Sequence, residues 1–193
     1  MGWRDLFIFG LQIAVIAMVL ILFCVFYRAG NNVLPIIQAP NPVLRQAVLP
    51  IEHIDDSIIS LGEDITATLR YRSMTDFFLK QSMPKGLAAP QVGIPRKLIV
   101  CGLNGEVKVM INPEILERKG NYPSYEGCLS VAKGKDRIIN RSAYLRLKYK
   151  GLDNRERILI ARNEDAAMLE HEIDHLNGIL NIDIRTDGGE GPL

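Results

Sequence analysis

The segment Ala166-Ala167-Met168-Leu169-Glu170-His171-Glu172-Ile173-Asp174-His175 places two histidines four residues apart, with a glutamate beside the first. Positions i and i+4 share one face of a helix, so His171 and His175 can bind a single metal ion while Glu172 stands next to it. The chain has only 3 histidines and two of them fall in this segment, which disfavours a chance polar face. The pattern predicts a helix that carries a hydrolytic metal site.

The flanking residues predict where this helix begins and ends. Asn163 is a favourable N-cap residue, and Glu164 and Asp165 place negative charge in the first turn. Gly178 provides a C-terminal stop. We therefore expect about four helical turns between Asn163 and Gly178.

A catalytic divalent ion usually takes three protein ligands, so a third ligand is needed. One protease class has a third histidine where this chain has Asn181, and a second class needs a later helix, which the glycine-rich surroundings of Glu190 do not allow. The third ligand should therefore lie upstream. Cys24 and Cys101 lie in apolar runs typical of core thiols, whereas Cys128 has a polar, loop-like setting. From the pattern alone, Cys128 is a metal ligand, a free buried thiol or a catalytic nucleophile.

Three motifs resemble those of the peptide deformylase family and occur in the same order. They are Gly86-Leu87-Ala88-Ala89-Pro90-Gln91-Val92-Gly93, Glu126-Gly127-Cys128-Leu129-Ser130 and His171-Glu172-Ile173-Asp174-His175-Leu176-Asn177-Gly178. The resemblance extends from about Pro35 to Arg185. It implies an α+β fold in which antiparallel strands wrap around the central helix that carries the HExxH motif.

The resemblance also implies the metal site. Cys128, His171 and His175 would bind one divalent ion, with a water molecule as the fourth ligand. One thiolate and two imidazoles suit Fe(II), Zn(II), Ni(II) or Co(II), but not Mg(II) or Ca(II). We expect Fe(II) as the native ion, with the other three as alternatives.

The implied reaction removes the formyl group from the formyl-methionine of nascent polypeptides and releases formate. Glu172 would act as general base on the water and then as general acid toward the departing amine. The side-chain amide of Gln91 and the backbone N–H of Leu129 would stabilise the negative oxygen that forms during attack. The expected partner is a formylated nascent peptide at the ribosome.

The expected substrate-binding residues are Gly86, Leu87, Lys85 and Arg137. Gly86 has no side chain, so the extended peptide backbone could come close. The family pattern has a glycine where this chain has Pro84 and an apolar residue where it has Lys85. Proline removes a backbone donor and lysine adds a charge at the mouth of the site, which favours an altered substrate preference.

The segment that follows the cysteine motif has an extra residue relative to the family pattern. Within it, Lys135 and Arg137 either contact the peptide or belong to a solvated loop, which is the more common role of such charges. Arg141 is expected to pair with Glu126.

The N-terminal region holds an almost unbroken apolar run from Leu6 to Tyr27, long enough to cross a bilayer core that needs about 20 residues. A cleaved signal peptide would have a shorter apolar core and a better cleavage site than Tyr27-Arg28-Ala29-Gly30. A buried core helix is the third reading. We expect a retained single-pass anchor, and Arg28 and Arg45 on its C-terminal flank favour a catalytic domain in the cytoplasm.

Composition and periodicity predict one domain behind this tether. The 193 residues divide into an anchor (1–30), a linker (31–35), a catalytic domain (36–186) and a disordered tail (187–193). A net charge of +1 gives no sign of nucleic-acid binding, and a monomer is expected. The 3 cysteines imply no disulfide framework.

Several further elements are predicted from local patterns. Apolar residues at helical spacing after Asp56 predict a helix that runs toward Lys80. Asn104-Gly105 predicts a hairpin between strands at 97–101 and 107–111. Strict alternation from Leu145 predicts a half-buried strand that turns through Asp153-Asn154 into a strand at 155–161.

Three functions remain open on sequence grounds. The first is a membrane-tethered deformylase. The second is an unrelated HExxH peptidase, which Gln91 and the missing downstream ligand disfavour. The third is a deformylase-like protein with altered N-acyl peptide specificity, or a catalytically silent member that binds peptides. Retention of Gln91, Cys128 and Glu172 disfavours a silent member.

Overall fold

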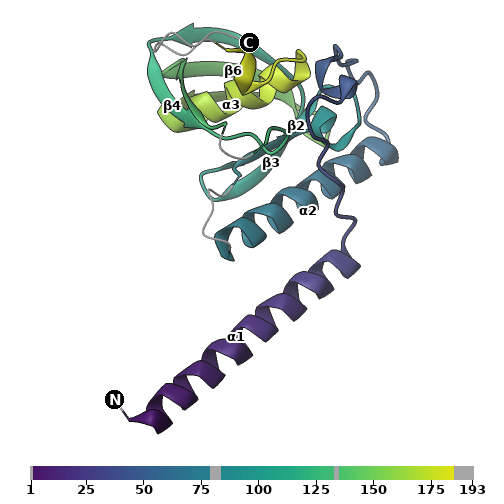
Figure 1. The fold of residues 1–193 in the computed structure, drawn as a ribbon. Coiled ribbons are helices and arrows are strands. Elements are labelled where there is room, and N and C mark those ends of the chain that lie inside the picture. Colours follow the sequence, from purple (N-terminus) through teal and green to yellow (C-terminus); the bar gives the residue numbers. More distant parts are fainter. Residues whose placement is uncertain (1, 79–83, 133–134, 185–193) are drawn as a thin grey trace.

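A computed structural model describes residues 2–78, 84–132 and 135–184 (Figure 1). The predicted disordered tail lies outside these residues, and the division of the chain into domains stays a prediction. The long helices are α1 (Trp3–Gly30), α2 (Asp56–Phe78) and α3 (Asn163–Leu176). The short 3₁₀ helices are η1 (Pro42–Arg45), η2 (Ala89–Val92) and η3 (Asn181–Asp183). The strands are β1 (Gly86–Ala88), β2 (Leu98–Leu103), β3 (Glu106–Lys119), β4 (Tyr122–Glu126), β5 (Arg137–Arg141), β6 (Tyr144–Lys150) and β7 (Glu156–Arg162).

The strands form two antiparallel sheets. One has the order β1-β2-β3-β6-β7 and the other pairs β4 with β5. Helix α3 lies inside the fold with strands around it, and α2 covers the outer side of the β2–β3 hairpin (Figure 1). The predicted α+β fold around a central HExxH helix is confirmed.

Two cores lie on opposite faces of the larger sheet, because successive strand residues point to opposite sides. On β2, Ile99 and Cys101 pack in the cluster that contains Leu169 and Ile173 of α3. The alternate β2 residues Leu98 and Val100 pack in the cluster that contains Ile65 and Leu69 of α2. The sheet therefore holds α3, and with it the metal motif, in a fully packed setting.

Both predicted hairpins are confirmed. Asn104 and Gly105 have φ angles of 52° and 79°, as a tight hairpin turn requires, and the paired strands extend beyond the predicted ranges. Asn154 has a φ of 59° in the turn between β6 and β7. Along β6, the side chains of Leu145 and Leu147 are buried and alternate with more exposed residues, as predicted.

The predicted start of the metal helix is wrong in one detail. Asn163 is the first residue of α3 and not a side-chain cap; no side chain caps this end. Its φ is 48°, and its backbone N–H bonds the carbonyl of Ala143 at 2.9 Å. Asparagine tolerates this left-handed conformation, so the chain turns directly from β7 into the helix. At the other end Gly178 has a φ of 73°, as expected of a helix stop.

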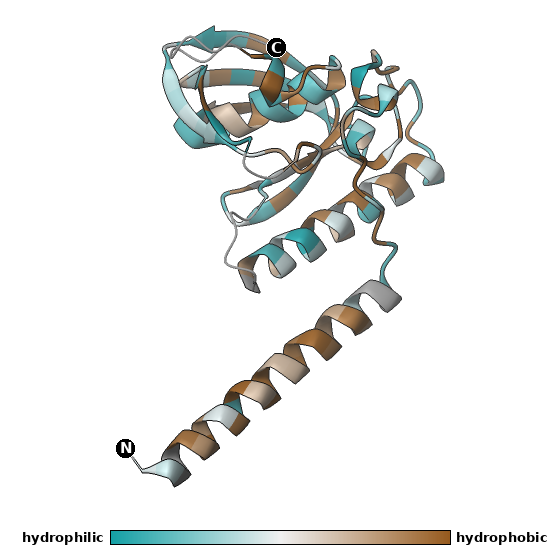
Figure 2. Cartoon of the chain, in the orientation of Figure 1, coloured by the Kyte–Doolittle hydropathy of each residue, from teal (hydrophilic) through white to brown (hydrophobic). Residues whose placement is uncertain are grey.

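Helix α1 contains the predicted apolar run. Leu6–Tyr27 is the one helical segment in the described residues that is long and apolar enough to cross a membrane, and none of it is buried by the rest of the chain. Apolar residues occur on all sides of this helix (Figure 2). Tyr27 stacks on Tyr71 of α2 with ring centroids 6.5 Å apart.

Candidate metal centre

Three predicted ligands converge. The ligand atoms of Cys128, His171 and His175 all lie within 4.8 Å of one another. The Nε2 atom of His175 is 3.4 Å from Cys128 Sγ and 3.2 Å from His171 Nε2. The two imidazole planes are nearly perpendicular, so both Nε2 atoms can face the same point. One thiolate and two imidazoles in this arrangement suit a tetrahedral site for a borderline or soft divalent ion.

Two different elements supply these ligands. Helix α3 places both histidines on its buried side, one turn apart, as the i, i+4 spacing predicted. Cys128 lies two residues after Glu126, the last residue of β4, where the chain leaves the small sheet. The strand pairing of β4 with β5 therefore brings Cys128 over α3.

A buried carboxylate orients the first histidine. Glu126 Oε2 lies 2.8 Å from His171 Nδ1, so the neutral imidazole donates its N–H there and leaves Nε2 free for a metal ion. Arg141 donates to both oxygens of Glu126 at 2.8 and 3.0 Å, and to Asp174 at 2.6 Å. The predicted pairing of Arg141 with Glu126 is confirmed. Burial by itself raises the pKa of Glu126, but the bonds from His171 and Arg141 outweigh it and lower that pKa to about 2.

The pKa values of the two histidines are shifted in opposite directions. Burial by itself lowers the pKa of His171, but Cys128, Glu126 and Glu172 raise it to about 10. Burial lowers the pKa of His175, and the charge of His171 lowers it further. A metal ion at this site therefore displaces a proton from His171, because only the neutral imidazole is a ligand.

Glu172 is a buried carboxyl group held beside these ligands. It is 4% exposed, and its Oε2 atom has no hydrogen-bond partner among the described residues. Burial raises the pKa of Glu172 to about 7. A carboxyl group with a pKa in this range can accept and return a proton near neutral pH.

Gly86 creates the space that Glu172 occupies. A Cβ atom added at Gly86 would lie 2.5 Å from Glu172 Oε1 and 2.6 Å from its Cγ. The absent side chain was expected to admit the peptide backbone. In the structure, the absence of a side chain at Gly86 also leaves room for the Glu172 carboxylate.

Gln91 is held in one orientation by its neighbours. Its Oε1 atom accepts the backbone N–H of Ala88 at 2.9 Å, which leaves the Nε2 group to point toward Ser130 Oγ at 3.3 Å and Cys128 Sγ at 3.7 Å. The loop beside it is anchored by Gln38, whose Nε2 donates to the carbonyl of Leu129 at 2.8 Å. The amide donors of Gln91 thus lie next to the metal ligands.

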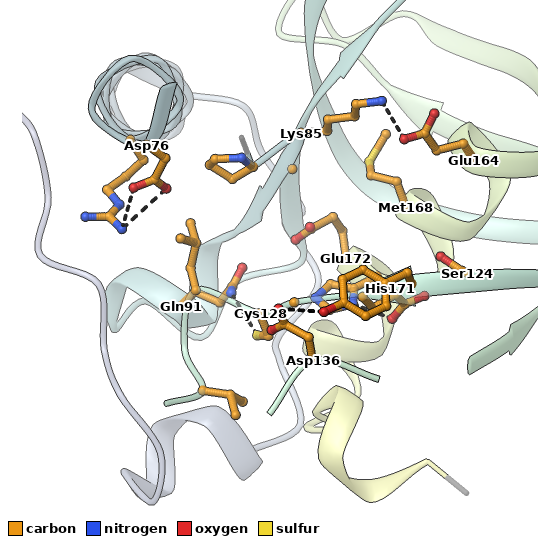
Figure 3. Close-up of a pocket in the computed structure, with 18 of the residues that line it drawn as sticks. Asp76, Lys85, Gln91, Ser124, Cys128, Asp136, Glu164, Met168, His171 and Glu172 are labelled. Atoms are coloured by element: carbon orange, nitrogen blue, oxygen red, sulfur yellow. Dashed lines mark hydrogen bonds and ion pairs between the residues drawn. The ribbon is translucent and has the colours of Figure 1, made fainter. Parts of the chain in front are cut away.

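A cavity of about 650 Å³ opens onto this centre (Figure 3). Most of the predicted site residues line it: Lys85, Gly86, Gln91, Cys128, Leu129, His171 and Glu172. Two predicted substrate residues do not. The Leu87 side chain is fully buried in the core under the sheet, and Arg137 donates to the carbonyl of Ile182 at 3.3 Å.

Other residues of the cavity were not anticipated from the sequence. Asp136 lines it in place of its neighbour Arg137, and Arg72 and Asp76 of α2 form an ion pair at 3.3 Å on its wall. Lys85 pairs with Glu164 of α3 at 2.7 Å (Figure 3). For Arg72 and Asp76, the signal in the sequence was a pair of opposite charges four residues apart in the predicted helix.

Comparisons with known proteins agree with this geometry. The family model described as polypeptide deformylase matches residues 33–189. A peptide deformylase of Agrobacterium fabrum is 38% identical over 155 residues, which is 77% of this chain and 85% of that protein. One of Syntrophomonas wolfei is 37% identical over 154 residues, which is 79% of this chain and 93% of that protein.

Solved structures share the fold as well. The peptide deformylase of Synechococcus elongatus in complex with actinonin has a TM-score of 0.70 at 31% identity and covers 81% of each chain. That of Thermotoga maritima has a TM-score of 0.70 at 30% identity, covering 80% of this chain and 98% of the other. The shared fold and the Cys-His-His site lead to one conclusion. This chain belongs to the peptide deformylase family, a family of metal-dependent hydrolases.

Proposed function

We propose that this chain removes the formyl group from formyl-methionine at the N-terminus of nascent polypeptides while it is tethered to a membrane. The observation that carries the chemistry is Glu172. A buried carboxylate oxygen without a partner among the described residues lies beside three convergent ligand atoms, at the floor of a cavity. Buried polar atoms nearly always have a hydrogen-bond partner, so an atom without one in the protein is expected to bond a substrate or a water molecule.

The proposed roles follow from these positions. Cys128, His171 and His175 hold the metal, which when bound supplies a Lewis acid that lowers the pKa of water in the site. Glu172 takes a proton from the water that attacks the formyl carbon and delivers it to the amine nitrogen as the C–N bond breaks. The products are formate and a free N-terminal methionine.

Gln91 and Leu129 are the proposed donors to the oxygen that becomes negative. The fixed orientation of the Gln91 amide supports this role, because donors that need no reorganisation stabilise a developing charge best. The bond from Gln38 to the Leu129 carbonyl fixes the peptide unit that follows Leu129. We propose Gly86 and Lys85 as substrate contacts, since both line the cavity.

Fe(II) is the proposed native metal, with Zn(II), Ni(II) and Co(II) as ions that the same ligands accept. The donor set supports this range, because a thiolate with two imidazoles selects late first-row ions over Mg(II) and Ca(II).

The experiment that tests the catalytic proposal is Glu172→Gln. The amide has nearly the same shape but cannot accept a proton, so formate release from a formyl-Met peptide should fall by about 10²–10⁴-fold. Metal content should stay the same, because all three ligands remain. A metal-loaded variant with near-normal formate release would show that Glu172 is not the base.

The tether is supported by α1. Its 22-residue apolar segment is unburied in the chain, and such a segment is long enough to cross a bilayer core. We propose a retained single-pass anchor with the catalytic part in the cytoplasm, where formylated nascent chains emerge from ribosomes. A reducing compartment would also preserve the Cys128 thiolate.

A further inference from the structure

A second cavity, of about 290 Å³, continues from the active-site cavity. Gln38, Arg72 and Leu129 line both cavities, so the two meet at these three residues. The second is otherwise lined by Val33, Leu34, Pro35, Ile36 and Tyr71. We call these eight residues the exit groove.

The exit groove leads toward the apolar helix. The linker that forms one wall is fixed to α2, since the N–H of Leu34 bonds Thr68 Oγ1 at 2.9 Å and Asn32 bonds Asp64 at 2.7 Å. Tyr71 of α2 also lines the groove, and it stacks on Tyr27 near the end of α1. The linker crosses α2 on its way from α1 to the catalytic part (Figure 1).

The distance from the groove to a membrane is short. From the end of α1 at Gly30 to the docked Leu34, the chain can span at most about 14 Å, at about 3.5 Å per residue. If α1 is in a bilayer, the groove therefore opens close to the bilayer surface. A longer or undocked linker would not impose this geometry.

The chemistry of the groove suits an extended peptide, because apolar side chains and the polar groups of Gln38 and Arg72 line it together. The linker wall contains the apolar residues Val33, Leu34, Pro35 and Ile36, of which Leu34 and Ile36 also pack against the core on the α2 side of the sheet. Arg72 adds hydrogen-bond donors: its Nε atom is buried without a partner among the described residues, and its bonds to Asp76 are long, at 3.3 and 3.5 Å. Peptide carbonyls are natural acceptors for such a group.

We propose that the exit groove binds the residues downstream of formyl-methionine in nascent membrane proteins, whose apolar segments lie in the bilayer beside α1. This inference rests on the proposed membrane-tethered deformylase. It assigns the enzyme a substrate class, namely formylated chains with an apolar segment held at the membrane. Downstream binding lowers KM for such chains without being needed for the chemistry at Glu172.

The test uses the full-length, metal-loaded protein in phospholipid vesicles with two substrates. One is the soluble peptide formyl-Met-Ala-Ser, and the other is a formyl-Met peptide anchored in the same vesicles by an apolar C-terminal segment. The readout is the ratio of kcat/KM for the anchored peptide to kcat/KM for the soluble peptide. Val33→Glu and Pro35→Glu each place a charge on the apolar wall, and Pro35 is exposed, so its replacement does not threaten folding.

Ile160→Glu is the matched control, because Ile160 is an apolar side chain of β7 that is 55% exposed and lines neither cavity. We expect each groove variant to lower the ratio at least fivefold through a higher KM for the anchored peptide, while the control keeps both values. An unchanged ratio in both groove variants would overturn the inference and would mean that lipid or solvent occupies the groove. No formate from either peptide with the unmodified protein would instead overturn the proposed function itself.

Discussion

Gly86 shows how one missing side chain can control the position of a proposed catalytic group. The Glu172 carboxyl group fills the space where a Cβ would lie, with its Oε1, Cγ and Cδ atoms all within 2.7 Å of that position. A Cβ at residue 86 would therefore force the Glu172 side chain away from its present position. The position of the proposed base therefore depends on a residue in a different element, the β1 strand.

We expect Gly86→Ala to lower formate release by about 10²-fold, since a displacement of about 1 Å in a catalytic group can cost this much. The metal ligands are untouched, so metal content should be normal. Formate release and bound metal are measured on the same preparation. Wild-type turnover would mean that Glu172 has another position from which it can act.

Cys128 makes the metal site sensitive to oxygen. A thiolate ligand and Fe(II) can both be oxidised, whereas Ni(II) is much less prone to oxidation. We expect the Fe(II) form to lose activity in air faster than the Ni(II) form, and to keep it under anaerobic conditions. Formate release is followed over time for both forms. Equal decay in air would argue against a Cys128-ligated iron site.

At the scale of elements, two glycines have left-handed backbone conformations but differ in the space around them. Comparing alanine substitutions at the two positions distinguishes backbone strain from steric collision. Gly105 has a φ of 79° in the β2–β3 turn, and an added Cβ would meet nothing within 4 Å. Gly178 has a φ of 73° after α3, and an added Cβ would lie 2.7 Å from the carbonyl oxygen of Arg45. Both positions strain an alanine, but only the second also forces backbone atoms apart.

Gly105→Ala should therefore lower the free energy of unfolding by about 1–2 kcal/mol, which is the cost of the left-handed conformation. Gly178→Ala should lower it by more. In a chain of this size each kcal/mol lowers Tm by about 2–4 °C. Thermal unfolding of the two variants at equal metal loading gives the comparison. If Gly178→Ala is as stable as Gly105→Ala, the contact between the end of α3 and Arg45 is looser than the structure indicates.

At the scale of the whole molecule, the catalytic part is tied to α1 by few contacts. Tyr27 of α1 stacks on Tyr71 of α2, and the groups that form hydrogen bonds from this side, Asn32 and Leu34, follow α1 in the chain. Every residue assigned to the chemistry lies between Lys85 and His175. The apolar helix therefore contributes little to the fold, and its proposed role is to tether the protein to a membrane.

A chain that begins at Asn32 should stay soluble and deformylate short formyl-Met peptides about as well as the full-length protein. Full-length protein should remain in the membrane fraction after an alkaline carbonate wash, because a span of this length is held by its transfer free energy and not by charge. Its N-terminal mass should show no cleavage near Gly30. A shortened mature chain, or a truncated protein that misfolds, would contradict the retained anchor.

Local patterns in the sequence were enough for the metal helix and for both hairpins, whereas the choice of Cys128 as the third ligand came from the family resemblance. The i, i+4 spacing of His171 and His175 sets their relation within a single helix, and Asn104-Gly105 sets the hairpin turn through its backbone preferences. Such features depend on residues close in the chain, so they can be read without the fold. The pairing of Arg141 with Glu126 was also predicted.

Contacts between distant segments were decided only by the tertiary structure. The strand alternation of β1 turns Leu87 into the core, and the pairing of β4 with β5 puts Asp136 in the cavity and directs Arg137 to Ile182. The close approach of Glu172 to Gly86 arises the same way. These outcomes depend on register and packing across many residues, where a shift of one position reverses which side chain faces the site. The sequence alone therefore predicted the metal ligands and the groups proposed for the chemistry, and the fold decided which side chains line the cavity around them.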